Sequence, residues 1–247
     1  MTNSIPWPTQ RAIREGMSFS AVVDINGVHN PKTGGFHTLQ DAHDANHQSI
    51  FVRNGTYQEG TITISKSDVT IVGESWDVVF TKTGSGHLFL ISGDRFDISN
   101  IQAYTPAGGG QSSRPFNITS GYQSRVRRCY IPQSDDIGMY WGSNASHRGL
   151  IMNNWFDACD SYPIYCDTQQ MFIGFNHFKD APGYAIYMES NSEDCVIVGN
   201  ICPGAGTAGL HIQANAEDTV AVANRFDGAV SDSSGTSTVA SNDETAF

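Results

Sequence analysis

Short apolar segments that end in a polar or small residue recur at a regular spacing along the chain. The steps from Asn154 to Asn176, Asn200 and Asn224 are 22, 24 and 24 residues, and the steps on either side of Arg128, which interrupts the asparagine series, are 28 and 26 residues. A period of about 20 to 50 residues is typical of a repeat architecture. We expect the asparagines to stack in one line. The repeat positions are Gly73, Asn100, Arg128, Asn154, Asn176, Asn200, Asn224 and Asn242.

A second type of segment repeats in step with the first and alternates apolar and polar residues. Alternation with a period of two predicts a strand with one buried face. It places Ile, Leu, Met and Cys inward and Tyr, His, Asp and Glu outward. These segments are Phe116-Asn-Ile-Thr, Met139-Tyr-Trp-Gly, Ile164-Tyr-Cys-Asp, Ile186-Tyr-Met-Glu and Leu210-His-Ile-Gln.

No helical periodicity occurs over residues 60–240. Repeats of this length without a crossover helix exclude βαβ units, leucine-rich repeats and helical solenoids. The sequence therefore predicts an all-β chain in which each repeat forms one coil of a parallel β-solenoid.

The start of the repeat region has a segment of a different kind. Residues 36–46 predict a short helix, and Ile50-Phe-Val-Arg-Asn-Gly-Thr-Tyr57 predicts a strand followed by Gly-x-Tyr. Together with the asparagine series, over about residues 36–242, the chain resembles the right-handed parallel β-helix superfamily of pectate lyases, polygalacturonases and phage tailspikes. The resemblance implies a single-stranded right-handed β-helix of roughly eight to nine coils, with a short helix that covers its first coil.

The first 35 residues do not continue the repeat. We expect residues 1–35 to form an attachment arm and hairpin, and residues 36–247 to form the β-helix domain. Trp7, Arg11 and Arg14 are the expected attachment residues of the arm, because an exposed tryptophan is a common interface anchor. Asp24-Ile-Asn-Gly27 is typical of a hairpin turn.

Composition and charge narrow the range of partners. The 247-residue chain carries a net charge of −11, which disfavours nucleic acid and anionic membranes as partners. The charge is uneven, since residues 1–129 hold 11 basic and 10 acidic side chains and residues 130–247 hold 3 and 15. The five cysteines contain no C-x-x-C pair and predict buried thiols. No stretch approaches the length of a membrane span, and the N-terminus does not read as a secretion signal, so we expect an unexported chain.

The outward positions of the alternating segments supply a candidate carbohydrate-binding face. Stacking the coils about 4.8 Å apart places Tyr140, Tyr165, Tyr187 and His211 in one row. Aromatic side chains with a polar edge suit a sugar, whose C–H face packs on a ring while its hydroxyls meet polar groups. Cross-strand packing of the aromatic rings is the alternative explanation.

The next outward row places two carboxylates on adjacent coils. Asp167 and Glu189 are the candidate catalytic pair, because carboxyl groups about 5 Å apart match a retaining glycosidase. Two solvated surface acids are the alternative. The chain lacks the Asn-Thr-Asp, Gly-His-Gly and Arg-x-Lys motifs of polygalacturonases, and the row contains no cation for lyase chemistry.

Metal-binding patterns are incomplete. Glu193-Asp194 and Glu217-Asp218 recur one coil apart and could share calcium, but solvated turns explain them better. His43 and His47 have the spacing of a zinc pair without an evident third ligand. We expect no metal and no cofactor.

These features favour a structural, non-enzymatic role. Tailspike-like proteins assemble in the host cytoplasm, so the resemblance implies a virion-associated β-helix, a decoration or spike protein that forms a homotrimer on a capsid or tail protein and contacts surface polysaccharide. Arg125, Arg127 and Arg128 form a basic group that can face the acidic half of another copy. The alternative is a polysaccharide depolymerase that uses Asp167 and Glu189.

Overall fold

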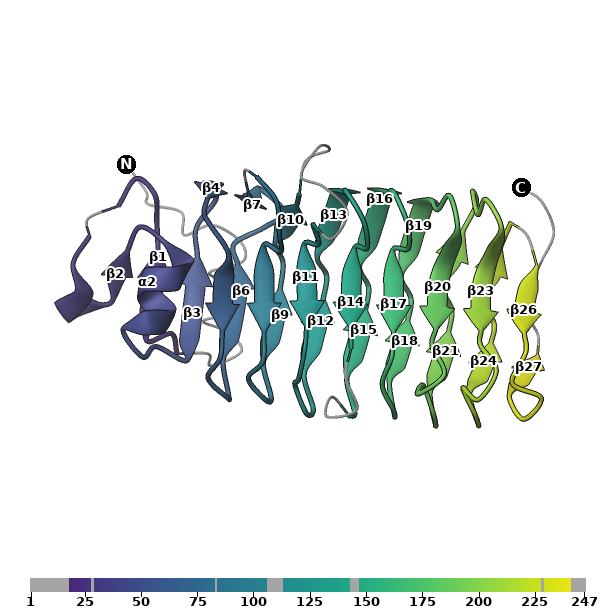
Figure 1. Cartoon of the computed structure of the whole chain (residues 1–247). Helices are drawn as coiled ribbons and strands as arrows, with labels where there is room; N and C mark the ends of the chain where they lie inside the picture. The colour runs from purple at the N-terminus through teal and green to yellow at the C-terminus, as the bar shows by residue number, and fades with distance from the viewer. Residues whose placement is uncertain are drawn as a thin grey trace.

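Three parallel sheets wrap around one axis and form the β-solenoid that the repeat predicts, with the right hand that the family resemblance implies (Figure 1). The computed structural model describes residues 18–27, 29–82, 84–105, 113–142, 147–227 and 229–240. Each coil contributes one strand to each sheet, and the eight strands of each smaller sheet give eight coils in this part of the chain. The coils follow one another side by side from the N-terminal end to β26 and β27.

The 11-stranded sheet, sheet A, contains the first strand of every coil and the strands at both ends. In spatial order it consists of β2 (Gly35–Phe36), β1 (Ala21–Val23), β3 (Ser49–Val52), β6 (Thr70–Gly73), β9 (Asp97–Ser99), β12 (Arg125–Arg127), β15 (Leu150–Met152), β18 (Phe172–Gly174), β21 (Val196–Val198), β24 (Val220–Val222) and β27 (Thr238–Ala240).

The two eight-stranded sheets contain the second and third strands of each coil. Sheet B consists of β4 (Gly55–Gln58), β7 (Val78–Thr81), β10 (Gln102–Tyr104), β13 (Tyr130–Ser134), β16 (Trp155–Cys159), β19 (His177–Asp180), β22 (Ile201–Cys202) and β25 (Arg225–Phe226). Sheet C consists of β5 (Ile62–Ile64), β8 (Phe89–Ile91), β11 (Phe116–Ile118), β14 (Met139–Trp141), β17 (Ile164–Cys166), β20 (Tyr184–Met188), β23 (Ala208–Ile212) and β26 (Val230–Asp232).

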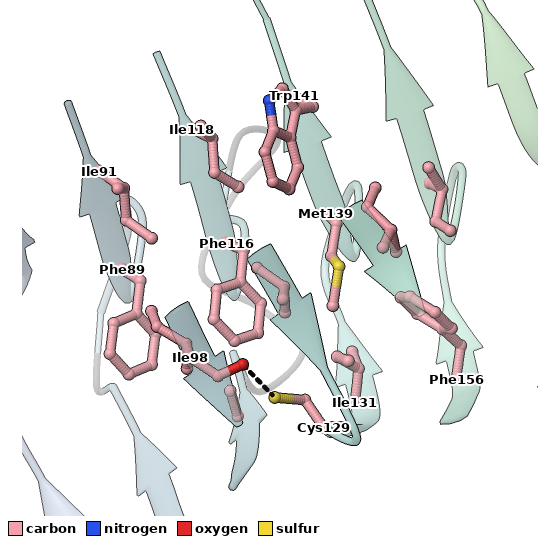
Figure 2. Close-up of a cluster of buried hydrophobic side chains, with 14 of the residues drawn as sticks. Phe89, Ile91, Ile98, Phe116, Ile118, Cys129, Ile131, Met139, Trp141 and Phe156 are labelled. Carbon is pink, nitrogen blue, oxygen red and sulfur yellow. Dashed lines mark hydrogen bonds between the residues drawn. The ribbon is translucent and has the colours of Figure 1, made fainter. Parts of the chain in front are cut away.

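The core is a set of stacked ladders of like residues. Phe89 and Phe116 in adjacent coils of sheet C stack with ring centroids 5.0 Å apart, and Phe156 and Phe178 in sheet B stack at 5.1 Å. Figure 2 shows the neighbouring Phe89 and Phe116 rings and the contact of the Cys129 thiol with the carbonyl of Ile98, which is 3.8 Å away. All five cysteines are free and buried, as the sequence predicts. Inward alternation therefore fills the solenoid with close-packed side chains.

A short helix covers the first coil, as expected. α2 (Leu39–Asp44) begins at Thr38, whose hydroxyl accepts a hydrogen bond from the amide of Asp41. The Glu59 carboxylate accepts from the amides of Leu39 and Gln40, and so satisfies two further N–H groups of the first turn. In the described ranges, no helix is long and apolar enough to cross a membrane.

The segment before the helix differs from the predicted hairpin. β1 pairs in parallel with both β2 and β3, so β1 and β2 extend sheet A at its N-terminal end. The turn at Asp24 exists, since Asp24 accepts from the amides of Asn26 and Gly27, but the strands around it are not antiparallel. The predicted hairpin is therefore wrong. A 3-10 turn, η1 (Pro31–Thr33), precedes β2. Trp7, Arg11 and Arg14 lie outside the described residues, and the arm remains a prediction.

Four of the predicted asparagines form a continuous ladder. Asn154, Asn176, Asn200 and Asn224 are buried, and the side-chain amide of each of the first three donates to the side-chain oxygen of the next at 2.9 to 3.0 Å. Each amide also donates to a backbone carbonyl of the preceding coil. The ladder ends at Cys129, whose backbone amide donates to Asn154 at 2.9 Å.

Asn100 does not belong to this ladder, and the prediction is wrong there. Asn100 and Arg128 have φ values of 56° and 53°, and they align with Asn153, at 56°, in the left-handed slot one residue earlier. Ile101 takes the ladder position in the coil of Asn100. Asparagine suits both places in this turn, because it tolerates the left-handed conformation and its amide can stack. Gly73 aligns with Asn100, and Asn242 lies outside the described residues.

Asn176→Leu is expected to lower the free energy of unfolding by about 1–3 kcal/mol, because it leaves buried polar groups unpaired on both sides. The backbone and side-chain amides of Asn154 lose their shared acceptor, the Asn176 side-chain oxygen. The side-chain oxygen of Asn200 loses its side-chain donor and keeps the backbone N–H of residue 176. Urea denaturation measures the change. Asn153→Gly is the control, because glycine keeps the left-handed turn without removing a ladder member. Equal stability of Asn176→Leu and wild type would contradict the ladder's role.

Candidate carbohydrate-binding surfaces

The predicted tyrosine row exists on the outer face of sheet C. The strand register pairs Tyr140 with Tyr165, Tyr165 with Tyr187, and Tyr187 with His211. Tyr140–Tyr165 and Tyr165–Tyr187 stack with centroids 5.2 Å apart and planes within 18° and 9°. All four side chains are half-buried. The register prediction is confirmed.

The four rings do not form a flat platform with their faces towards solvent. Because neighbouring rings stack on one another, the faces of Tyr165 are covered by Tyr140 and Tyr187. Arg114 lies over the Tyr140 ring at 4.1 Å and pairs with Asp136 at 2.9 Å. The row therefore presents ring edges and hydroxyl groups to solvent. Two further residues, Tyr162 and Tyr184, pack against the row, and the alternation pattern did not place them there.

The two candidate catalytic carboxylates have different environments. Glu189 accepts a short hydrogen bond from the Tyr165 hydroxyl, and a backbone amide, that of Ser190, donates to its other oxygen at 3.2 Å. Asp167 accepts from the side-chain amide of Asn191 at 2.7 Å. Burial, with help from Glu189, raises the pKa of Tyr165, so this hydroxyl remains a donor at neutral pH. Each carboxylate is thus held by a neighbour, and the catalytic role remains a prediction.

A second aromatic surface, absent from the sequence predictions, lies on sheet B. Trp76, in the turn before β7, Tyr130 on β13 and Trp155 on β16 line a cavity of about 390 Å³ together with Asp157 and Lys179. We call these five residues the tryptophan cleft. Trp76 and Trp155 are 43% and 37% exposed, the largest exposures among tryptophans of the described chain. Large exposed aromatics around a cavity of this size are typical of ligand sites.

Asp157 organises the tryptophan cleft. The Tyr130 hydroxyl donates to one oxygen of this carboxylate at 2.5 Å, and the Trp155 indole N–H donates to the other at 2.6 Å. Burial and the bond to Asp157 raise the pKa of Tyr130 to about 12, so the phenol stays protonated at neutral pH. The carboxylate is fixed in place and retains lone pairs for a ligand.

The positions of the two tryptophans are also fixed. The Trp76 indole N–H donates to the carbonyl of Arg128 at 2.7 Å, and its ring lies 5.7 Å from that of Tyr130. His177 stacks on Trp155 at 3.8 Å but does not line the cavity. The part of the Trp155 indole that lines the cavity is therefore not the part that His177 covers. Anchored aromatic rings lose little freedom when a ligand binds.

One signal in the sequence marks this site. Trp155 lies between the ladder residue Asn154 and the buried Phe156. The residue type at this position differs from repeat to repeat, and the alternation places its side chain outward. A tryptophan in an outward slot is unusual enough to be a site candidate. Trp76 carries no such signal, because its position over sheet B depends on the conformation of a turn.

The comparison with protein families decides the fold family. A family model described as "Right handed beta helix region" matches residues 42–227. The chain belongs to this family. Among solved structures, it is similar to "Geobacillus virus E2 - ORF18", with 12% identity and a TM-score of 0.47, over 82% of this chain and 55% of that chain. The chain thus spans about half the length of that structure. No curated protein matches it.

Of the remaining predicted residues of this β-helix, Arg128 contacts the tryptophan cleft through its carbonyl, which accepts from Trp76, whereas Arg125, Arg127, His43 and His47 do not line it. Arg127 on β12 forms a two-point ion pair with Asp97, and Arg125 lines a 480 Å³ depression on sheet A. The His43 ring is buried, whereas the His47 ring packs edge-on against Phe36. Within the described chain, no group of three or more His, Cys, Asp or Glu side chains is arranged to hold a metal ion.

Proposed function

We propose that this β-helix is a structural protein of a phage-like particle that binds a polysaccharide without cleaving it, and that a sugar ring occupies the tryptophan cleft. The observation that supports the sugar site most directly is that two exposed tryptophans line one cavity with a carboxylate held by Trp155 and Tyr130. The particle role rests on the resemblance to phage tailspikes, and probing purified particles for the chain tests it.

The chemistry of the tryptophan cleft suits a pyranose. Ring faces carry negative partial charge, and the C–H groups of a sugar are weakly positive, so the two attract. Asp157 can accept from sugar hydroxyls, and Lys179, one coil further on, can donate to ring or acidic oxygens. Lys179 also disfavours a cationic ligand by charge repulsion. These groups support a neutral or acidic saccharide as the ligand.

The tyrosine row on sheet C is a second proposed contact for the same class of ligand. It offers hydroxyl groups and the carboxylates Asp167 and Glu189, which can hydrogen-bond to sugar hydroxyls along the solenoid. The adjacent placement of these two acids also favours one alternative function, a glycoside hydrolase. In that case one acid protonates the glycosidic oxygen and the other attacks the anomeric carbon.

Incubation with a panel of surface polysaccharides separates binding from cleavage. We expect retention of the protein on at least one polysaccharide column and no new reducing ends, because binding groups are present and the catalytic motifs of the polygalacturonases are absent. New reducing ends that fall by several orders of magnitude in Asp167→Asn and Glu189→Gln would establish the hydrolase instead. Neither binding nor cleavage would contradict both functions.

A further inference from the structure

The outer face of sheet A is apolar over four successive coils. Strands β15, β18, β21 and β24 read Leu-Ile-Met, Phe-Ile-Gly, Val-Ile-Val and Val-Ala-Val, and only the central residue of each points into the core. The outward residues are Leu150, Met152, Phe172, Gly174, Val196, Val198, Val220 and Val222. We call these eight residues the apolar face.

Strands that are apolar at every position, as these four are, are typical of parallel sheets that are covered on both sides. On sheet C of the same coils the outward residues are instead Tyr165, Tyr187 and His211. Val196 and Val220 are 38% and 37% exposed, and no element in the described part of the chain packs over them. An exposed apolar strip of this kind marks an interaction surface.

Charges change sign along one edge of the apolar face. The turn before each strand of sheet A stacks on the turn of the next coil, through backbone hydrogen bonds that link Arg95, Gln123, Arg148, Gln170 and Asp194 with their neighbours. Basic residues occur in this column before β9 and β15, whereas Asp194 and Asp218 precede β21 and β24. Arg125 adds a positive charge on β12. Asp68 precedes β6 in the same column and forms an ion pair with Arg95. The edge is therefore basic around Arg125 and Arg148 and acidic at Asp194 and Asp218.

We propose that a second copy of this chain covers the apolar face, with the two solenoids antiparallel and the twofold axis at β18. This arrangement places β15 opposite the partner's β21 and β12 opposite β24, so that Arg148 of one copy faces the acidic turn at Asp194 of the other. A parallel threefold arrangement would place the same coils side by side and bring acidic turns together. Complementary charge therefore favours a dimer over the trimer that the tailspike resemblance implies.

The size of the surface requires the charged turns to take part. The four strands of the apolar face, β15 to β24, span about 14 Å at ~4.8 Å per step. A strip of that length and one strand wide covers at most a few hundred Å². A stable complex buries about 800 Å² on each partner. The flanking turns and the arginine-lined depression at Arg95, Arg125 and Arg148 must therefore contribute to the interface.

Sedimentation of matched aspartate variants tests the proposal. Wild type is expected to have twice the 26.8 kDa chain mass, and Val196→Asp is expected to raise the dimer Kd at least ~100-fold, because it buries an unpaired charge twice. Ile201→Asp is the control, since Ile201 is equally exposed, at 38%, in the same coil but on sheet B. A monomeric or trimeric wild type, or equal effects of the two variants, would overturn the proposal.

Exchanging the charges at Arg148 and Asp194 gives a second test, because a misfolded variant would not regain dimer affinity when the second substitution is added. Arg148→Asp alone is expected to weaken the dimer about tenfold at low salt, and adding Asp194→Arg is expected to restore it, because the pair is re-formed across the interface with reversed signs. Within one chain the two positions lie two coils apart, which is about 10 Å. A double variant that dimerises no better than Arg148→Asp would overturn the antiparallel arrangement.

Discussion

Gly73→Ala is expected to destabilise the β-helix by at least about 3 kcal/mol, or to prevent folding, because the new methyl group has no space. A Cβ at this position would lie 2.0 Å from the carbonyl oxygen of Asn100 and 2.8 Å from a methyl carbon of Ile101. The opposing atom is backbone in the next coil, held by the pairing of β6 with β9. Relief of the clash therefore requires the coils to separate.

Thermal and urea unfolding of purified protein measure this effect, with Gly60→Ala as the matched control. No atom lies within 4 Å of a Cβ built on Gly60, so we expect its stability to remain within about 0.5 kcal/mol of wild type or to rise. A Gly73→Ala variant as stable as Gly60→Ala would mean that the two coils are not in contact as described.

Trp155→Ala is expected to weaken polysaccharide binding by about 30-fold or more, and Trp76→Ala by about tenfold or more. Truncating an aromatic anchor at the centre of a site costs about 2 kcal/mol or more. Trp155 carries the larger effect because it also donates to Asp157 and holds that carboxylate towards the ligand. Titration calorimetry with the polysaccharide retained by wild type gives the two affinities.

Tyr187→Ala is the matched comparison for these variants, because it removes an aromatic ring of the tyrosine row and leaves the tryptophan cleft intact. If the sugar occupies the tryptophan cleft, Tyr187→Ala is expected to bind within about threefold of wild type. A large loss in Tyr187→Ala and none in Trp155→Ala would move the principal binding site to sheet C.

Much of the fold could be predicted because each repeat has the same local requirements. The alternation in Ile164-Tyr-Cys and Ile186-Tyr-Met determines which residues enter the core, and the observed register pairs these segments residue by residue. The misplacement of Asn100 had a physical cause. The turn has two adjacent positions that favour asparagine, and spacing alone cannot separate them.

The candidate site was less predictable because it depends on side-chain directions and on contacts between distant segments. Period-two alternation placed Tyr165 outward but carried no information on whether its ring face or its edge meets solvent. The tryptophan cleft joins Trp76, in the turn before β7, with Trp155 three coils further along sheet B. That meeting follows from the coil geometry and from the hydrogen bond of Trp76 to Arg128.

A crystal structure of the protein soaked with an oligosaccharide from the bound polysaccharide tests the central claim most directly. We predict density for a pyranose in the tryptophan cleft, with a ring face against Trp76 or Trp155, a hydroxyl within hydrogen-bonding distance of Asp157, and an intact glycosidic bond. A sugar bound only along Tyr140, Tyr165 and Tyr187, or a cleaved product beside Asp167 and Glu189, would contradict it.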